Sequence, residues 1–270
     1  MKIQLSLIIV NYNGLKYLKD CFDSFYAKLE NISFEIIVID NDSSDASCQY
    51  IKDNYPEIIL IESKINHGFG KGNNEAVKRA KGEYLLLINN DTILIDQIKP
   101  VLDFLQSDKT VGAVGINMLD ANQQYIPAVG LFPNKRNMLQ LRKLLDVNSD
   151  FINNKFTKSN YDVDWICGSF MMVPKIVFEK INGFDEDYFM YVEDVDFCKK
   201  IEKSGLRRVF LPNFSYIHFV GFKKSKNKML INGYKTYISK HFKGIEKLAM
   251  LAILQVNNFV KTIKSTLKLD

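Results

Sequence analysis

Two acidic clusters carry the chemistry that this sequence offers, and each follows a run of apolar residues. Asn89-Asn90-Asp91 comes directly after residues 84–88, and Glu193-Asp194 follows residues 189–192. Open parallel sheets bind ligands just beyond the carboxyl ends of their strands. One cluster could therefore hold a divalent cation with a diphosphate, while the other takes a proton from a hydroxyl. Transfer of a sugar from a nucleotide-diphospho-sugar needs both tasks.

Three single residues have a functional and a purely structural interpretation. Asp40, at the end of an apolar run, could accept the imide N–H of uracil or thymine, or it could only form a turn. Asp91 could bind Mg²⁺ or Mn²⁺ through a carboxylate oxygen, or it could belong to a simple turn. His218 lies between apolar residues, so it could complete the metal site or pack in the core.

Residues 66–74 are rich in glycine and asparagine and lie between an expected strand and an expected helix. The glycines would let the backbone approach an anion at the start of that helix. An ordinary flexible loop is the alternative. The segment is not a Walker loop, because Lys71 is followed by Gly72 rather than by serine or threonine.

Glu193 and Asp194 are neighbours at an expected helix start, so their side chains point in different directions. One can act as a base and the other can orient it. Acids are also favoured at a helix start by the helix dipole alone. Trp165 is the only tryptophan and could be a core residue or could stack on a sugar ring.

The pattern of apolar residues predicts an α/β fold with a mostly parallel sheet covered by helices on both faces. In the first half, Ser43 or Ser44 is expected to cap a helix that runs toward Asp53, and Gly82 to end a helix over residues 73–80. Residues 122–162 are expected to be an acceptor-side insertion or a mobile loop. The expected strands cover residues 5–10, 34–39, 58–61, 84–88, 111–116, 165–173, 207–211 and 215–219.

The composition fits a globular cytoplasmic protein. Of the 270 residues, 47% are hydrophobic, and the four cysteines are scattered, which favours neither a zinc site nor a disulfide framework. A reducing cytosol fits such cysteine usage. The apolar run at residues 5–10 is too short for a signal peptide, and no run approaches the roughly 20 residues of a membrane span.

Positive charge is concentrated at the carboxyl end. Residues 222–270 carry a net +9 and the whole chain +5, which leaves −4 for residues 1–221. An apolar stripe there includes Leu248, Leu251 and Leu254. The stripe could pack on the rest of the chain or on a second subunit, or it could contact an anionic membrane leaflet. Nucleic acid is a poorer partner for such apolar residues.

The order of these motifs resembles that of the family 2 inverting glycosyltransferases of the GT-A fold. The resemblance covers about residues 3–221 and is closest to the rhamnosyltransferase and galactofuranosyltransferase-like branch. That branch shows Asn-Asn-Asp in place of an Asp-rich metal motif, which leaves Asp91 as the only carboxylate there and gives His218 more weight. The matching segments are residues 8–13, 38–45, 66–74, 89–91, 165–169, 183–186 and 191–196, with His218.

The resemblance implies a GT-A catalytic domain over residues 1–221, followed by a basic amphipathic helical tail over residues 222–270. It implies that Asp194 is the catalytic base, assisted by Glu193, and that Asp91 and His218 hold Mg²⁺ or Mn²⁺. The implied acceptor-binding residues are Trp165, Gly168 and Asp185. The implied nucleotide-sugar-binding residues are Asn11, Tyr12, Asp40, Asn66, Gly68, Lys71, Asn74 and Asn90.

The implied reaction transfers a sugar from dTDP-rhamnose or a UDP-sugar to a hydroxyl of a glycan or polyprenyl-linked acceptor in cell-surface polysaccharide synthesis. The expected place is the cytoplasm, with peripheral contact to the inner face of the cell membrane, and a homodimer is an open expectation. Two alternatives remain. One is a nucleotide-sugar binding protein without turnover. The other is a nucleotidyltransferase, which should have a basic triphosphate-binding loop that residues 11–14 lack.

Overall fold

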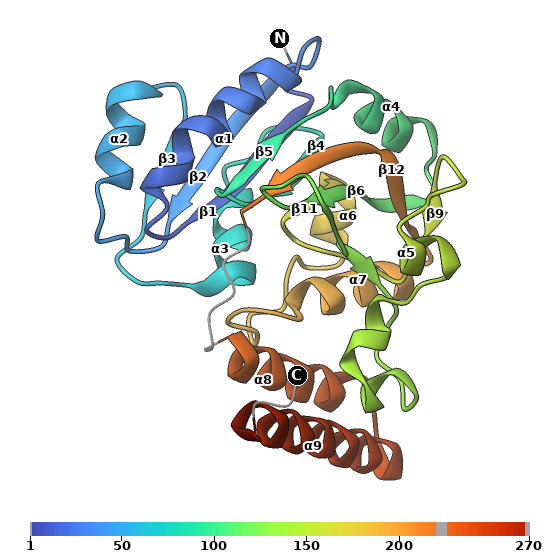
Figure 1. Ribbon diagram of the computed structural model, residues 1–270. Helices are drawn as coiled ribbons and strands as arrows, with labels where there is room; N and C mark the ends of the chain where they lie inside the picture. Colours follow the sequence, from blue (N-terminus) through green and yellow to red (C-terminus); the bar gives the residue numbers. More distant parts are fainter. Residues whose placement is uncertain (1, 220–225, 268–270) are drawn as a thin grey trace.

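Strands and helices alternate along the first half of the chain, as the sequence predicts. The computed structural model describes residues 2–219 and 226–267. Its first strands and helices, coloured blue, lie at the left of Figure 1. The elements are β1 (Leu5–Asn11), α1 (Leu15–Lys28), β2 (Phe34–Asp40), α2 (Ser47–Asn54), β3 (Ile59–Glu62), α3 (Gly68–Val77), β4 (Tyr84–Ile88), β5 (Thr92–Leu94), α4 (Lys99–Ser107) and β6 (Val111–Leu119).

The second half adds shorter strands, one long strand and the last helices. The two final helices lie together at one end of the molecule (Figure 1). The elements are β7 (Tyr125–Ile126), β8 (Val129–Gly130), the 3₁₀ turns η1 (Asn137–Leu139) and η2 (Leu141–Leu145), α5 (Ser149–Asn153), β9 (Tyr161–Asp162), β10 (Trp165–Ile166), β11 (Phe170–Pro174), α6 (Lys175–Lys180), α7 (Glu193–Lys203), β12 (Arg207–His218), α8 (Lys226–His241) and α9 (Gly244–Leu267).

The sheet brings the ends of several strands to one edge. Its strand order is β3-β2-β1-β4-β11-β6-β12-β5. β1 pairs in parallel with β2 on one side and with β4 on the other, so the strand order reverses at β1. This reversal makes a topological switch point at the carboxyl end of β1. β11 is antiparallel to β4 and β6, whereas β12 is parallel to β6. The start of β11 and the end of β12 therefore lie at the same edge as the ends of β1, β2 and β4.

Alternating strand residues separate two apolar layers, one on each face of the sheet. Leu7 and Ile9 of β1 face the layer with α1, α2 and α4, whereas Ile8 faces the layer with α3, α6 and α7. All three strand residues are fully buried. The predicted α/β architecture with helices on both faces is confirmed.

The glycine-rich segment differs from its prediction. Helix α3 begins at Gly68, not at Asn73, so Gly68, Gly70 and Gly72 belong to its first turns. It ends at Val77 with Lys78 as the C-cap residue, so the prediction that Gly82 ends this helix is wrong. A Cβ on Gly68 would lie 2.0 Å from the carbonyl oxygen of Phe189, and one on Gly72 would lie 3.1 Å from Val10. The glycines therefore allow close packing of a helix, a need that a glycine-rich sequence does not distinguish from loop flexibility.

Three other features were predicted wrongly. The strand expected over residues 165–173 is two strands, because β10 pairs with β8 in a separate small sheet. The two strands expected over residues 207–219 are one, β12, which continues through an irregularity between Leu211 and Ser215. At the start of α2, Oδ1 of Asp45 accepts from the backbone N–H of Ser47 at 3.0 Å, so Asp45 serves this helix end in place of Ser43 or Ser44.

Residues 122–162 hold short strands and turns rather than a bare loop, and Phe151 and Tyr161 of this segment are buried. The predicted boundary at residue 221 lies outside the described residues. The helices beyond it pack on the rest of the chain: Tyr237 and Ile238 of α8 and Leu254 of α9 belong to the same apolar layer as α7. Among the described residues, no helix is both long enough and apolar enough to cross a membrane.

Candidate active site

A buried chain of amides and one carboxylate joins the ends of β2, β1 and β4. The side chain of Asn90 donates to Oδ1 of Asn11 at 2.6 Å, and the side chain of Asn11 donates to Oδ2 of Asp40 at 2.6 Å. Oδ1 of Asp40 accepts from the backbone N–H of Ser43 at 2.8 Å. Asn11 and Asp40 are almost fully buried, so this chain fixes the strand ends, and the exposed Tyr12 projects beyond it.

A second polar group fixes the start of α3. The side chain of Asn41 donates to the carbonyl oxygen of Gly68 at 2.9 Å, and Oδ1 of Asn66 accepts from the backbone N–H of Gly68 at 2.9 Å. Lys71 forms a half-exposed ion pair with Glu186 at 3.0 Å. Asn66 and Gly68 thus lie beside the switch point, and the Lys71 ammonium faces an acid rather than standing alone.

Asp91 and His218 meet at the end of β4 although 126 other residues separate them in the chain. Nε2 of His218 lies 3.1 Å from Oδ1 of Asp91 and 3.2 Å from the side-chain nitrogen of Asn89. β12 delivers the histidine, since His218 pairs with Thr92 in the sheet. Apart from this contact with His218, the buried Oδ1 of Asp91 accepts no hydrogen bond from any described residue.

A buried carboxylate oxygen that lacks a hydrogen bond and lies beside an imidazole nitrogen fits a divalent cation. Within residues 2–219 and 226–267, no group of three or more His, Cys, Asp and Glu side chains could hold a metal ion on its own. Mg²⁺ commonly takes only one or two protein carboxylates and completes its shell with water and substrate phosphate oxygens. The pair Asp91 and His218 therefore suits a cation that arrives with a diphosphate.

Asp194 lies at the start of α7 and is only partly buried, whereas Glu193 beside it is 5% exposed. Oδ2 of Asp194 accepts from the backbone N–H of Gly168 at 3.2 Å. Burial raises the pKa of Asp194, although the N–H groups of Gly168 and Val195 act in the opposite direction. Burial and the nearby Asp194 charge raise the pKa of Glu193 well above its usual value. The two acids therefore differ, as their neighbouring positions on a helix predict.

The Gly168-Ser169 segment links the two acidic clusters. The backbone N–H of Gly168 donates to Asp194, and the carbonyl oxygen of Ser169 accepts from the backbone N–H of Asn89 at 3.2 Å. The hydroxyl of Ser169 also lies 2.7 Å from the hydroxyl of the buried Tyr216. Because Gly168 and Ser169 are adjacent, the base candidate and the metal candidate are held on one frame at one edge of the sheet.

Three of the predicted ligand-binding residues have partners within the protein. Both groups of the Asn74 amide bond to the backbone of Phe184, at 3.0 and 2.9 Å, so Asn74 joins α3 to that turn, and its expected contact with the sugar-diphosphate stays a prediction. The indole of Trp165 donates to the carbonyl oxygen of Leu131 at 3.0 Å, which favours its core interpretation. Asp185 forms an ion pair with Lys240 of α8 at 2.8 Å.

Two polar residues of this site lie in segments that the sequence singles out, but no separate role was predicted for either. Asn89 contacts His218, and Asn41 holds the start of α3. Asn41 follows Asp40, and Asn89 lies two residues before Asp91, within the same short polar runs. This position in the sequence was the only feature that could have indicated their role. The residues that contact α8, such as Asp185, carry no such signal in the sequence, because only the folded structure brings them to α8.

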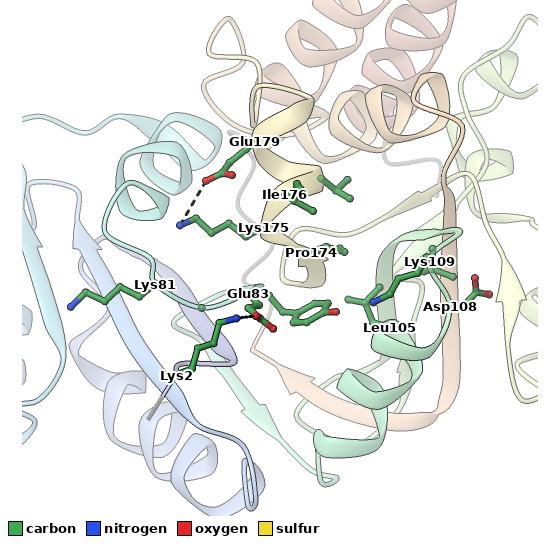
Figure 2. Close-up of a pocket in the computed structure, with 14 residues that line it drawn as sticks. Lys2, Lys81, Glu83, Leu105, Asp108, Lys109, Pro174, Lys175, Ile176 and Glu179 are labelled. Atoms are coloured by element: carbon green, nitrogen blue, oxygen red, sulfur yellow. Dashed lines mark ion pairs between the residues drawn. The ribbon is translucent and has the colours of Figure 1, made fainter.

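A cavity of about 540 Å³ lies at the opposite edge of the sheet, between the start of β4, the end of α4 and the start of α6 (Figure 2). Two ion pairs lie among its charged residues, Lys2 with Glu83 and Lys175 with Glu179. It contains none of the residues of the polar edge described above. The candidate site is therefore the open edge and not this cavity.

Comparison with known families identifies two matching models. Residues 6–156 match the model described as "Glycosyl transferase family 2". Residues 151–226 match the model described as "N-terminal domain of galactosyltransferase". The first match includes the polar edge from Asn11 to Asp91, and the second includes Asp194 and His218.

Three known proteins illustrate the similarity. The chain is 30% identical over 222 residues to rhamnosyltransferase WbbL of Escherichia coli K12, covering 79% of this chain and 82% of that protein. It is 25% identical over 238 residues to the N-acetylglucosaminyl-diphospho-decaprenol L-rhamnosyltransferase of Mycobacterium tuberculosis, covering 79% and 75%. The mannosyltransferase of Pyrobaculum calidifontis, solved with GDP-Man and Mn²⁺, shares the fold with a TM-score of 0.63 and 16% identity, covering 98% of this chain and 76% of that one.

Proposed function

The chain belongs to glycosyl transferase family 2, and we propose that it inverts the anomeric centre of a sugar as it transfers that sugar from a dTDP- or UDP-linked donor to a hydroxyl group. The observation that carries this proposal is the shared frame of Asp194 and Asp91, linked through Gly168 and Ser169. Such a frame supports a base on one side of the anomeric carbon and a diphosphate site on the other.

Asp194 acts as the general base in this proposal. The acceptor hydroxyl oxygen forms a bond to the anomeric carbon, its proton passes to Asp194, and the bond from that carbon to the diphosphate breaks. Direct displacement inverts the centre and needs no carboxylate nucleophile. A pKa raised by burial suits this role, because the carboxylate then binds a proton more readily. Glu193, the buried neighbour of Asp194 in α7, helps to orient it.

The leaving diphosphate belongs beside Asp91 and His218. These residues would hold Mg²⁺ or Mn²⁺, and Oδ1 of Asp91, which lacks a hydrogen bond, supports this assignment. A bound cation would offset the negative charge that grows on the departing diphosphate. Asn90 and Asn11 fix the backbone around this position through their mutual hydrogen bond.

The nucleoside belongs beside Tyr12, over the ends of β1 and β2. Tyr12 is 54% exposed, so its ring is free to contact a base. Asp40 is 2% exposed and already accepts from Asn11 and Ser43. In this structure Asp40 holds the strand ends in place. To accept the imide N–H of uracil or thymine, it needs a local movement of the surrounding residues that exposes one of its carboxylate oxygens.

The proposed donor is dTDP-rhamnose or a UDP-sugar, with rhamnose the favoured sugar, and the proposed acceptor is polyprenyl-linked. The names of the two rhamnosyltransferases described above support the sugar, and the decaprenol diphosphate in the mycobacterial name supports the acceptor. Synthesis of a cell-surface polysaccharide follows from such an acceptor. A binding protein without turnover would have no need for Asp194, and a nucleotidyltransferase would need a basic triphosphate loop that residues 11–14 lack.

The helices after residue 221 support a peripheral contact with a membrane at the inner leaflet. We propose that residues 1–221 catalyse the transfer and that α9 binds the protein to an anionic membrane surface. Leu248 and Phe259 of α9 are 67% and 65% exposed. Arg142 and Lys143 of the adjoining η2 turn are exposed as well, and η1 packs on α9. An exposed apolar face in a part of the chain that carries positive charge is complementary to an anionic leaflet.

A donor screen tests the proposed function. The purified full chain is incubated with Mn²⁺, a polyprenyl-diphosphate-linked sugar and, in turn, dTDP-rhamnose, UDP-galactofuranose, UDP-glucose or GDP-mannose. Release of the nucleoside diphosphate together with a glycosylated acceptor is expected for a dTDP- or UDP-linked donor. Binding of donors without any glycosylated product would favour the binding-protein alternative, and transfer from GDP-mannose alone would overturn the proposed donor class.

A further inference from the structure

The turn before the candidate base has an unusual backbone. Tyr191 and Val192 have φ angles of +71° and +75°, and they directly precede Glu193 and Asp194. Positive φ is unfavourable for a β-branched residue such as valine. Strain of this kind persists only where the surroundings enforce it. The direction in which α7 presents Asp194 depends on this turn.

Helix α3 supports the turn from one side. The backbone N–H of Phe69 donates to the carbonyl oxygen of Phe189 at 3.0 Å. A Cβ on Gly68 would lie 2.0 Å from the same oxygen, so only glycine lets α3 approach this closely. The contact includes Gly68, for which the family resemblance implies nucleotide-sugar binding.

Helix α8 supports the turn from the other side. A Cβ on Gly233 would lie 2.4 Å from the carbonyl oxygen of Tyr191 and 2.8 Å from Cγ2 of Val192. Val192 is 3% exposed, so it has no open space into which it could move. The strained turn is therefore enclosed between glycines of two helices that are far apart in the sequence.

Polar contacts fix α8 against the same region. Lys240 forms ion pairs with Asp185 and Asp187, at 2.8 and 2.6 Å. Nε2 of His241 lies 2.6 Å from Oδ1 of Asp196, which follows the acidic pair on α7. The hydroxyl of Tyr188 donates to the same oxygen at 3.3 Å. These contacts hold α8 to both ends of the segment from Asp185 to Asp196.

We propose that α8 is a positioning element of the catalytic centre, and that Gly233 is its positioning residue, because the close contact of Gly233 with Tyr191 and Val192 sets the direction of Asp194. This inference rests on the proposed role of Asp194 as the base. It assigns to the tail a task separate from membrane contact: α8 completes the site, while α9 lies outside it.

The test compares Gly233→Ala with Asn232→Ala in the full chain. Asn232 is the exposed neighbour of Gly233 on α8. Alanine stabilises a helix more than glycine does, so helix propensity alone would not lower activity. Gly233→Ala is expected to lower kcat about 10- to 100-fold, the scale of a small misplacement of a catalytic group, with little change in the KM of the donor. Asn232→Ala is expected to keep the wild-type kcat.

A pH profile separates positioning from general damage. In Gly233→Ala, the pH at which kcat falls on the acid side should move, because the surroundings of Asp194 change. If kcat of Gly233→Ala falls by the same factor at every pH, so that the shape of the pH profile is unchanged, the inference is overturned. A wild-type kcat would overturn it as well. If Gly233→Ala does not fold, Lys240→Gln decides: a lower kcat with unchanged donor KM supports the inference, and wild-type values overturn it. Absence of transfer by the wild-type chain would instead reject the proposed function.

Discussion

At the scale of single residues, Asp194 and Asp91 account for different parts of the reaction. Asp194 is partly exposed at the start of α7, and its pKa is raised by burial. Asp91 has a buried oxygen, Oδ1, whose close polar contact is with the imidazole of His218 and to which no other described residue donates a hydrogen bond. The first property suits proton transfer and the second suits a cation, so substitutions at the two positions should have separable effects.

Replacement of the base should leave donor binding intact. We expect Asp194→Asn to lower kcat by roughly 10² or more, because the amide accepts no proton and general-base assistance is lost. The amide keeps the size of the side chain. Affinity for the nucleoside diphosphate, measured by calorimetry, should change little. Near-normal turnover in Asp194→Asn would exclude Asp194 as the base.

The pH dependence of transfer should reflect the raised pKa of Asp194. The base must be ionised, so kcat/KM should fall as the pH drops through that pKa. Because burial raises the pKa, the fall should begin above the value of about 3.9 that is ordinary for aspartate. Initial rates measured across the acid range test this. If kcat/KM stays constant down to a pH of that ordinary value, the assignment of Asp194 as a base with a raised pKa is contradicted. The residual activity of Asp194→Asn should not show this fall on the acid side.

Loss of the metal ligand should remove the effect of the cation on nucleotide binding. In calorimetry with the nucleoside diphosphate, Mn²⁺ should tighten binding to the wild type but not to Asp91→Ala. His218→Ala should show a smaller defect, since one carboxylate remains. Equal enhancement by Mn²⁺ in the wild type and in Asp91→Ala would rule out Asp91 as a ligand.

At the scale of elements, α3 is held to the turn at Phe184 by the Asn74 amide. We expect Asn74→Ala to cost about 1–3 kcal/mol of folding free energy, because two backbone groups lose their partner. Melting temperature should fall by several degrees, whereas Asn54→Ala, an exposed asparagine that bonds within α2, should change it little. Lower donor affinity with unchanged stability would return Asn74 to the sugar-diphosphate.

The elements also show what a sequence predicts well. The strands at residues 34–39 and 84–88 were predicted nearly to the residue, because buried parallel strands are continuous apolar runs with polar ends. The start of α3 was not, since its glycines serve close packing against Phe189 and Val10. Asp40, Asp91 and His218 were placed at strand ends correctly. The pairing of Asp185 with Lys240 could not be predicted, because only the fold brings α8 to that turn.

At the scale of the whole molecule, the tail has an inner and an outer part. Tyr237 and Ile238 of α8 lie in the core, so a truncation at Gly221 would remove part of that core and would not be a clean test of membrane contact. The outward face of α9 is different, since Leu248, Val256 and Phe259 are all more than half exposed. Substitutions on this face should leave the fold intact.

The double variant Leu248→Ser with Phe259→Ser should lose affinity for anionic vesicles. The wild type should co-sediment with phosphatidylglycerol vesicles at low salt and be released at high salt, because each nearby lysine or arginine contributes about 1 kcal/mol that salt screens. Ile176→Ser, at another exposed apolar residue, is the control and should bind like the wild type. A wild-type dimer that the double variant loses, without vesicle binding by either, would assign the face to a second subunit.

The stereochemistry of the product tests the central claim most directly. The anomeric configuration of the transferred sugar can be determined by NMR spectroscopy on the glycosylated acceptor and compared with that of the donor. Direct displacement with Asp194 as base predicts a single product whose configuration is opposite to that of the donor. A product that retains the donor configuration would contradict the account, because retention requires a different arrangement of groups around the anomeric carbon.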